Sequence, residues 1–245
     1  MSGFYKNIGG MVRPATKDEL VNEIRIRIDR GQTNLNDIDT SRITDMSDLF
    51  YDFKQIQNID ISLWDVSNVR DMSYMFYSCY HFNCDLSRWN TSNVESMTSL
   101  FSGCNNFNSD LSMWDVSKVE NMSDTFCFCI SFNSDLSKWN VGRVKSMNCM
   151  FYGCVKFNSD LSKWNVSNVM NISDMFSGCE EFDSDLSKWD VSNVEMMTST
   201  FYKCIQFNCD LSKWNVIKVR NIRYIFDKSG ISKKPNWYYD TYNIY

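Results

Sequence analysis

Residues 85–109, with the sequence DLSRWNTSNVESMTSLFSGCNNFNS, define a unit that recurs along most of the chain at a constant spacing of 25 residues. Three residue types mark the period. Tryptophan occupies Trp64, Trp89, Trp114, Trp139, Trp164, Trp189 and Trp214; phenylalanine occupies Phe76, Phe101, Phe126, Phe151, Phe176, Phe201 and Phe226; cysteine occupies Cys79, Cys104, Cys129, Cys154, Cys179 and Cys204. A fixed period of this size is the signature of a stacked repeat protein, in which each unit buries its apolar face against its neighbours.

The apolar spacing inside one unit predicts its local structure. Leu86, Trp89 and Thr91, with valine replacing threonine in most copies, give the pattern L-x-x-W-x-V. This pattern matches the strand of a leucine-rich repeat. The apolar residues from Val94 to Phe107 follow at steps of three or four, and Ser92 with Glu95 fits a capping box. We therefore expect a leucine-rich-repeat-like solenoid of short parallel strands and short helical returns.

The two ends of the chain depart from the repeat and predict its boundaries. Residues 1–13 are expected to form a disordered N-terminus. Residues 14–33 hold a capping box, Thr16 to Glu19, and a helical apolar stripe, so we expect a capping helix there. The solenoid should span residues 34–226. Residues 227–245 carry Trp237, Tyr238, Tyr239 and Tyr242, and we interpret them as an aromatic cap over the last unit.

The charge and hydropathy of the chain argue against two kinds of partner, nucleic acid and the membrane interior. The formal net charge of −5 argues against a nucleic-acid-binding protein, which normally carries a basic face. The sequence holds no apolar run long enough to span a membrane and no secretory signal pattern, so we expect no membrane insertion and a cytoplasmic protein. We also expect a monomer.

The ten cysteines divide into a repeat row and four others. The row is flanked by phenylalanine and methionine, where a thiol packs as a small hydrophobe, so we expect reduced core thiols. Cys84, Cys127, Cys149 and Cys209 lie off the row and are expected to be exposed. Cys127 and Cys129 are too close for the usual zinc pair, and no metal site is expected.

The motif F-N-x-D-L-S-x-W-[ND]-V-S-x-V-x-x-M-x-x-M-F-x-x-C, over residues 14–226, resembles the BspA-like leucine-rich-repeat surface proteins in their 25-residue variant. This resemblance implies a solenoid used for adhesion or protein recognition, without catalysis or cofactors. It also implies a cell-surface or secreted location, in contrast to the cytoplasmic one indicated by the missing signal pattern.

One aspartate per unit forms what we call the aspartate ladder: Asp60, Asp85, Asp110, Asp135, Asp160, Asp185 and Asp210. We expect each carboxylate to bond backbone N–H groups in its own turn. The alternative is that the ladder holds calcium and the protein is a structural coat. Because every copy carries the same groups and His81 is the only histidine, no catalytic constellation is predicted.

The expected strand places a triplet of side chains outward in each unit, and most of them are polar, although Leu63 and Met113 interrupt the row of cations. The candidate partner-binding residues are Arg88, Asn90, Lys138, Asn140, Lys163, Asn165, Lys188, Asp190, Lys213 and Asn215. Solenoids bind partners through extended concave faces, and a row of cations suits a protein partner with exposed carboxylates. A merely solvated face is the other interpretation of the same pattern.

Overall fold

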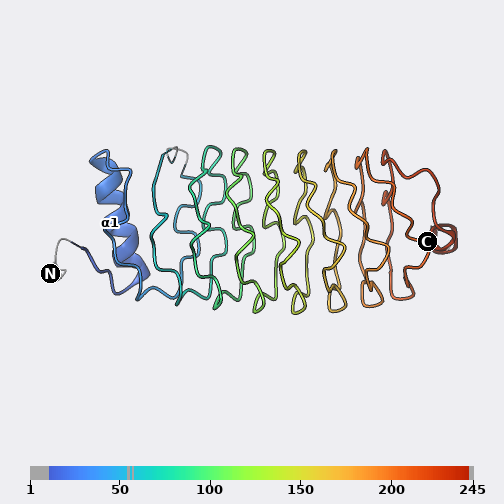
Figure 1. Ribbon diagram of the computed structural model, residues 1–245, viewed down its shortest axis with the longest axis horizontal. Coiled ribbons are helices and arrows are strands. Elements are labelled where there is room, and N and C mark those ends of the chain that lie inside the picture. Colours follow the sequence, from blue (N-terminus) through green and yellow to red (C-terminus); the bar gives the residue numbers. More distant parts are fainter. Residues whose placement is uncertain (1–10, 54–55, 57, 243–245) are drawn as a thin grey trace.

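The computed structural model describes residues 11–53, 56 and 58–242, and it shows a straight stack of similar coils. Helix α1 (Lys17–Asp29) lies across the N-terminal end of the stack, and the C-terminal segment with helix α2 (Asn236–Tyr242) lies at the opposite end (Figure 1). Successive coils lie side by side along the long axis, so equivalent residues of neighbouring units are brought together.

Helix α1 forms where the capping box predicts it. The Thr16 hydroxyl accepts a hydrogen bond from the Glu19 backbone N–H at 3.2 Å, and the Glu19 carboxylate accepts one from the Ala15 N–H at 2.7 Å. The apolar side of the helix buries Leu20 and Ile24, which join the core of the first coil. The helix thereby covers apolar surface that the first coil would otherwise expose.

Each coil is a chain of tight turns. In the unit that begins at Asp85, the backbone N–H groups of Trp89, Val94, Leu100, Cys104 and Phe107 each donate to the carbonyl three residues earlier, at 2.9–3.2 Å. The described coils contain no strand longer than a single residue. Isolated parallel bridges join Asp71 to Ser96, Ser96 to Asn121, and the equivalent residues of later coils up to Asn221.

The predicted strand at L-x-x-W-x-V was therefore wrong. Its residues lie in two turns, Leu86 to Trp89 and Thr91 to Val94. The physical reason is the Asx turn, in which an Asp or Asn side chain accepts the N–H two residues further on and competes with extended pairing. Asp85 accepts from Ser87, and Asn90 accepts from Ser92.

Backbone pairing between coils instead follows the segment where we predicted a helical return. We call residues 95–103 and their equivalents the pairing segment. The N–H groups of Met97, Ser99, Phe101 and Gly103 donate to carbonyls of the next coil at 2.7–3.4 Å. Ser99 has φ of 54°, and its equivalents are also left-handed, so no helix continues through this segment. Glu95 forms no capping box with Ser92; it pairs with Arg70 of the preceding coil at 2.9 Å.

The core lies between the tryptophan turns and the pairing segment. Phe126 is fully buried, and its ring stacks on Phe101 and Phe151 at centroid distances of 5.7 and 5.6 Å. The Trp139 indole N–H donates to the Leu111 carbonyl of the preceding coil at 3.0 Å, and all equivalent tryptophans do the same. These indole hydrogen bonds link neighbouring coils along the tryptophan turns, where the described coils have no continuous row of backbone hydrogen bonds between them.

The cysteine row is buried as predicted, with every thiol free. Each Sγ donates to a phenylalanine carbonyl of the preceding coil at 2.8–3.0 Å. Burial raises the pKa of these thiols, to about 12 for Cys79. Among the off-row cysteines the prediction was wrong for Cys127, which is buried, while Cys84, Cys149 and Cys209 are half-buried.

The C-terminal segment packs over the last coil. Trp237 stacks on Trp214 at 6.4 Å, its indole N–H donates to the Leu211 carbonyl at 2.8 Å, and Tyr238 contacts Phe226. Trp237 thus continues the tryptophan row by one more position. The side chain of Tyr242, which we also predicted to cover this end, lies outside the described residues, as do residues 1–10 of the predicted disordered N-terminus. The prediction of disorder was wrong for Val12, which forms a parallel bridge with Ile38 of the first coil.

Candidate functional site

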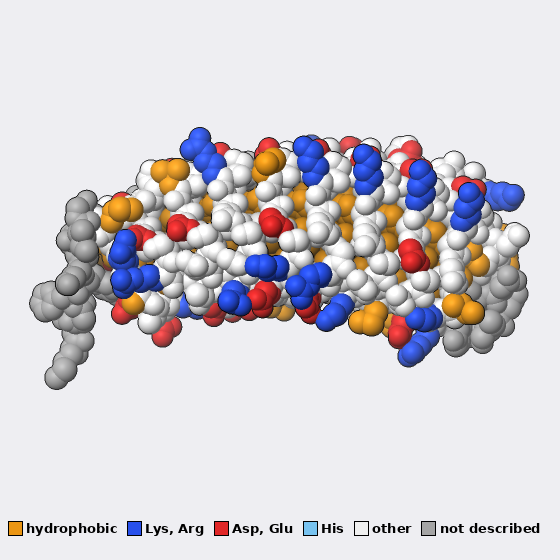
Figure 2. All heavy atoms as spheres, turned by 60° about the horizontal axis from the view of Figure 1, so that its bottom comes forward, with side chains coloured by type: hydrophobic (Ala, Val, Ile, Leu, Met, Phe, Trp, Pro, Cys, Tyr) orange, Lys and Arg blue, Asp and Glu red, His pale blue; other side chains and the backbone are white. Residues whose placement is uncertain are grey.

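The candidate partner-binding residues lie together on the turns that carry the tryptophans. All ten predicted residues are exposed: Arg88, Asn90, Lys138, Asn140, Lys163, Asn165, Lys188, Asp190, Lys213 and Asn215. The intervening tryptophans are buried, so the predicted alternation of inward and outward side chains holds although no strand is present. A row of Lys and Arg side chains follows the long axis of this face (Figure 2).

The amide and carboxylate members of this set also have a structural role. The side-chain oxygens of Asn90, Asn140, Asn165, Asp190 and Asn215 each accept the backbone N–H two residues further on, at 3.0–3.3 Å. These side chains hold the second turn of each coil in place. The cations are consequently the more direct candidates for contact with a partner, and we call Arg88, Lys138, Lys163, Lys188 and Lys213 the basic row.

The aspartate ladder runs beside the basic row, three residues earlier in each unit. All seven carboxylates accept the N–H of the serine two residues on, at 2.9–3.1 Å. These hydrogen bonds, from the serine N–H and hydroxyl, are the main reason that the pKa of Asp85, Asp135, Asp160, Asp185 and Asp210 is lowered. The bonds relieve the repulsion between stacked carboxylates, and the predicted turn role of the ladder is confirmed.

Basic side chains differ between the two sides of the stack. On the side of the pairing segment, Arg70, Arg143, Lys145 and Arg220 form ion pairs with glutamates of neighbouring coils at 2.7–3.1 Å. Within the part of the chain that the structure describes, no member of the basic row forms an ion pair. These five cations are thus exposed and available, whereas those of the other side bind neighbouring coils to one another.

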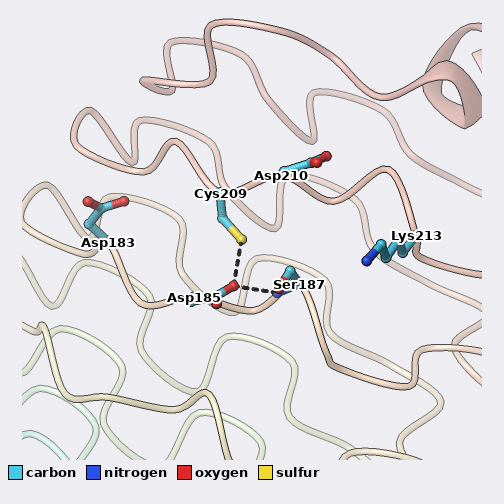
Figure 3. A pocket seen from close by; sticks show the side chains of 6 residues that line it. All are labelled: Asp183, Asp185, Ser187, Cys209, Asp210 and Lys213. Atoms are coloured by element: carbon cyan, nitrogen blue, oxygen red, sulfur yellow. Dashed lines mark hydrogen bonds between the residues drawn. The ribbon is translucent and has the colours of Figure 1, made fainter.

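A surface pocket of about 390 Å³ lies at the C-terminal end of the ribbon formed by the basic row and the aspartate ladder (Figure 3). Its lining residues are Asp183, Asp185, Ser187, Cys209, Asp210 and Lys213. Figure 3 shows Cys209 above Asp185, and its thiol donates to the Asp185 carboxylate at 3.4 Å. The same carboxylate accepts the Ser187 N–H at 2.9 Å.

The Cys209 thiol of this pocket is a weak nucleophile at neutral pH. Burial is the main cause that raises the pKa of Cys209 to about 11, with Asp185 adding to it, so the thiol is protonated at neutral pH. The pocket lining offers three carboxylates and one ammonium group, and the Asp185 carboxylate accepts the thiol hydrogen bond. Among the described residues, no group of three or more His, Cys, Asp or Glu side chains is arranged to hold a metal ion.

Three members of this pocket, Asp183, Ser187 and Cys209, were not predicted as site residues. Cys209 occupies the position at which other coils carry serine, and these serines are Ser109, Ser134, Ser159 and Ser184. Their hydroxyls accept the N–H of a leucine in the preceding coil at 2.8–2.9 Å. Cysteine replaces serine in this column at Cys84 and Cys209, and this replacement was the available signal that these coils differ from the others.

Comparison with known proteins places the chain in a family. A family model described as "Mycoplasma protein of unknown function" (DUF285) matches residues 21–137 and 123–237. The chain belongs to this family. The two overlapping matches extend from within helix α1 through the coils to the start of the C-terminal segment.

The comparison with solved structures includes a leucine-rich repeat protein from Eubacterium ventriosum ATCC 27560. It shares 15% sequence identity with this family member, with a TM-score of 0.37, over 80% of this chain and 43% of the other. The chain thus spans less than half the length of that protein. No curated protein sequence matches the chain. Among the described residues, no helix has the length and apolar character needed to cross a bilayer.

Proposed function

We propose that this protein is a non-enzymatic interaction module that binds a protein partner through the basic row. The observation that carries the proposal is the contrast in charge pairing between the two sides of the stack. Four cations on the pairing-segment side, Arg70, Arg143, Lys145 and Arg220, form ion pairs with glutamates, whereas Lys138, Lys163, Lys188 and Lys213 have no ion-pair partner among the described residues. Each of these lysines also attracts the ladder carboxylate of its own coil and lowers its pKa, but without a direct ion pair. The exposed ammonium groups can therefore attract a complementary surface and speed its association.

The neighbouring rows restrict the kind of partner. The long lysine side chains extend from turns whose aspartates, such as Asp135 and Asp160, already accept hydrogen bonds. A fitting partner therefore presents carboxylates over the lysines and hydrogen-bond donors over the aspartates. This double requirement makes the ribbon more selective than a simple basic patch.

The resemblance to BspA-like surface proteins supports the same proposal, because that family uses its repeats for adhesion or protein recognition. We extend it to this chain as an adhesion or recognition role, and we assign the chain to the 25-residue variant of that group. The hydrogen bonds of the aspartate ladder favour this role over a calcium-stabilised coat, because the carboxylates have partners without a cation.

The proposal is tested by capture of binding partners from cell lysate and surface extract with three forms of the protein. One form carries Lys138, Lys163, Lys188 and Lys213 changed to Gln. A matched control form carries Lys118, Lys145, Lys203 and Lys218 changed to Gln, which alters the net charge equally. We expect a partner that the intact chain and the control retain and that the basic-row variant loses. Equal capture by all three forms would contradict the proposal.

A further inference from the structure

Met170 is the apolar member of a row of charged side chains at the start of the pairing segment. The other members of the row form ion pairs between neighbouring coils at 2.7–3.1 Å, and these pairs are Arg70 with Glu95, Glu120 with Lys145, and Glu195 with Arg220. Met170 therefore lies between two ion pairs and belongs to neither. It is 45% exposed, so apolar surface faces the solvent in the middle of a charged row.

A second exposed methionine lies next to Met170 in the following coil. The Met196 backbone N–H donates to the Met170 carbonyl at 3.3 Å, and Met196 is 42% exposed. The equivalents of Met196 in the other coils are polar, and they are Asp71, Ser96, Asn121, Ser146, Asn171 and Asn221. We call Met170 and Met196 the methionine pair. Here two neighbouring coils both carry an apolar residue where the repeat otherwise has polar ones.

Met196 leaves a buried hydroxyl without a hydrogen bond. The Ser73 hydroxyl bonds to that of Ser96, 23 residues later, at 2.7 Å. Ser173 is the equivalent of Ser73, and Met196 occupies the position of its partner. The Ser173 hydroxyl oxygen is buried and has no partner in the described part of the chain. A serine at position 196 would satisfy this oxygen, so the hydrogen bonding of the fold does not explain an exposed methionine there.

Met170 lines a surface pocket of about 560 Å³ that extends over five successive coils. The lining residues are Glu120, Arg143, Lys145, Asn168, Met170, Asn193, Glu195 and Lys218. We call this the methionine pocket. Met170 is its only apolar lining residue and comes from the middle coil of the five, so charged and amide side chains flank it on both sides along the stack.

The flank on the N-terminal side of Met170 carries an excess positive charge. Arg143 and Lys145 both form ion pairs with the single carboxylate of Glu120, at 3.0 and 2.7 Å. Two cations and one carboxylate give this flank a net charge of +1. It can therefore accept a further carboxylate from a partner.

The flank on the C-terminal side has the same balance with different partners. Glu195 forms an ion pair with Arg220 at 3.1 Å. Lys218 donates to the Asn193 side-chain oxygen at 2.6 Å and, within the described part of the chain, forms no ion pair. Two cations and one carboxylate again give a net charge of +1, so the methionine pair lies between two flanks that both attract anions.

We propose that the methionine pocket is a docking site for a partner segment in which one apolar residue is flanked on each side by acidic residues. The flexible thioether side chains of the methionine pair adapt to an apolar side chain, and the flanking cations attract the carboxylates. This site is separate from the basic row: it lies on the pairing segment, uses none of the basic-row lysines, and requires an apolar residue in the partner.

The proposal is tested by calorimetric titration at low salt with an acetylated and amidated peptide of sequence Glu-Glu-Ala-Leu-Ala-Glu-Glu. The protein is the full chain with Lys138, Lys163, Lys188 and Lys213 changed to Gln, so that the basic row does not contribute. A control peptide with serine in place of leucine should bind about three- to tenfold more weakly, because it lacks the apolar contact. A second control peptide, with glutamine in place of every glutamate, should bind at least about tenfold more weakly.

Variants of the methionine pair locate the contact in this same form of the protein. Changing Met170 to Gln and Met196 to Ser should reduce the affinity for the leucine peptide to that for the serine peptide. The matched control is Met113→Gln, because Met113 is also an exposed methionine but lies on the tryptophan turns, outside the pocket. Met196→Ser supplies Ser173 with a partner, so the double variant should fold, and circular dichroism checks this.

NMR spectra of the methionine methyl groups locate the peptide independently of its affinity. The leucine peptide should shift the signals of Met170 and Met196 and leave that of Met113 in place. Equal binding of the leucine and serine peptides would overturn the proposal, as would equal affinities of the double variant and Met113→Gln. A shift of the Met113 signal alone, or failure of the chain to bind the leucine peptide, would overturn it as well.

Discussion

The hydrogen bonds between coils can be tested by changing two buried serines to alanine, one that forms such a bond and one that forms none. The Ser159 hydroxyl accepts the Leu136 N–H of the preceding coil at 2.8 Å. The Ser173 hydroxyl oxygen is buried and has no hydrogen-bond partner in the described part of the chain. The two serines are 7% and 9% exposed, so Ser→Ala removes the same atom from similar burial.

The expected magnitudes follow from these contacts. Ser159→Ala leaves the buried Leu136 N–H without its acceptor, which costs about 1–3 kcal/mol in the free energy of unfolding. Ser173→Ala removes a buried polar atom whose desolvation is not compensated, so its effect should lie between zero and a gain of about 1 kcal/mol. Ser159→Cys should fall between the two, because sulfur is a weak acceptor and cysteine occupies this column at Cys84 and Cys209.

Urea unfolding followed by tryptophan fluorescence measures the difference, with the slope of the transition checked for each variant. A lower midpoint for Ser159→Ala, together with an unchanged or higher midpoint for Ser173→Ala, supports the inter-coil contact. Equal destabilisation by the two substitutions would refute the reasoning, because burial alone would then explain both effects.

Four further predictions concern the aspartate ladder and the thiols. The ladder carboxyls have a lowered pKa in the folded state, so they stabilise the fold at any pH above their unfolded pKa of about 3.9. This stabilisation is lost as the pH falls through their folded pKa. The thermal unfolding temperature should therefore fall below about pH 4, and an unchanged midpoint down to pH 2 would contradict this. Asp160→Asn keeps an oxygen that accepts the Ser162 N–H, whereas Asp160→Ala removes it, so at pH 7 the Ala variant should be less stable by about 0.5–1.5 kcal/mol in urea unfolding. Calcium at millimolar concentration should leave the melting temperature unchanged, since the turns already engage the carboxylates; a rise of several degrees would favour the coat alternative. The buried row thiols, such as Cys154, should resist alkylation at pH 8 in the folded protein and react fully in urea, and rapid labelling of the folded protein would contradict their placement.

The sequence predicted which residues face inward because burial follows the period of the repeat. Trp139, Phe151 and Cys154 recur at positions that every coil buries, and the outward positions of Lys138 and Asn140 follow from the same alternation. These assignments depend only on the spacing of residues along the sequence, because residues 25 positions apart occupy equivalent places in stacked coils.

The local backbone conformation was predicted wrongly because short polar side chains decide it. Asp85 and Asn90 each close a turn that a strand pattern alone does not reveal. Likewise, the left-handed conformation of Ser99 and its equivalents falls on Ser, Asp, Cys or Tyr, with no glycine to indicate it. The pairing of coils along residues 95–103 was therefore not visible in the spacing.

The candidate site was predicted in its residues but not in its charge balance. Contacts between units decide which cations are paired, as when Lys145 forms an ion pair with Glu120 of the preceding coil at 2.7 Å. The pocket, too, is formed by residues of two coils. Such contacts join residues about one unit apart and follow from the geometry of stacking.

The central claim is that the basic row is open to carboxylates, and the affinity for a hexaglutamate peptide at low salt tests it most directly. The measurement compares the intact chain, the variant with Lys138, Lys163, Lys188 and Lys213 changed to Glu, and a control with Lys118, Lys145, Lys203 and Lys218 changed to Glu. We predict binding to the intact chain, at least about tenfold weaker binding to the basic-row variant, and a smaller loss in the control. The control lysines already have neighbours: Lys145 pairs with Glu120, Lys118 and Lys218 donate to asparagine side chains, and Lys203 lies near the Tyr202 ring. Equal losses in both variants, or no binding to the intact chain, would contradict the claim.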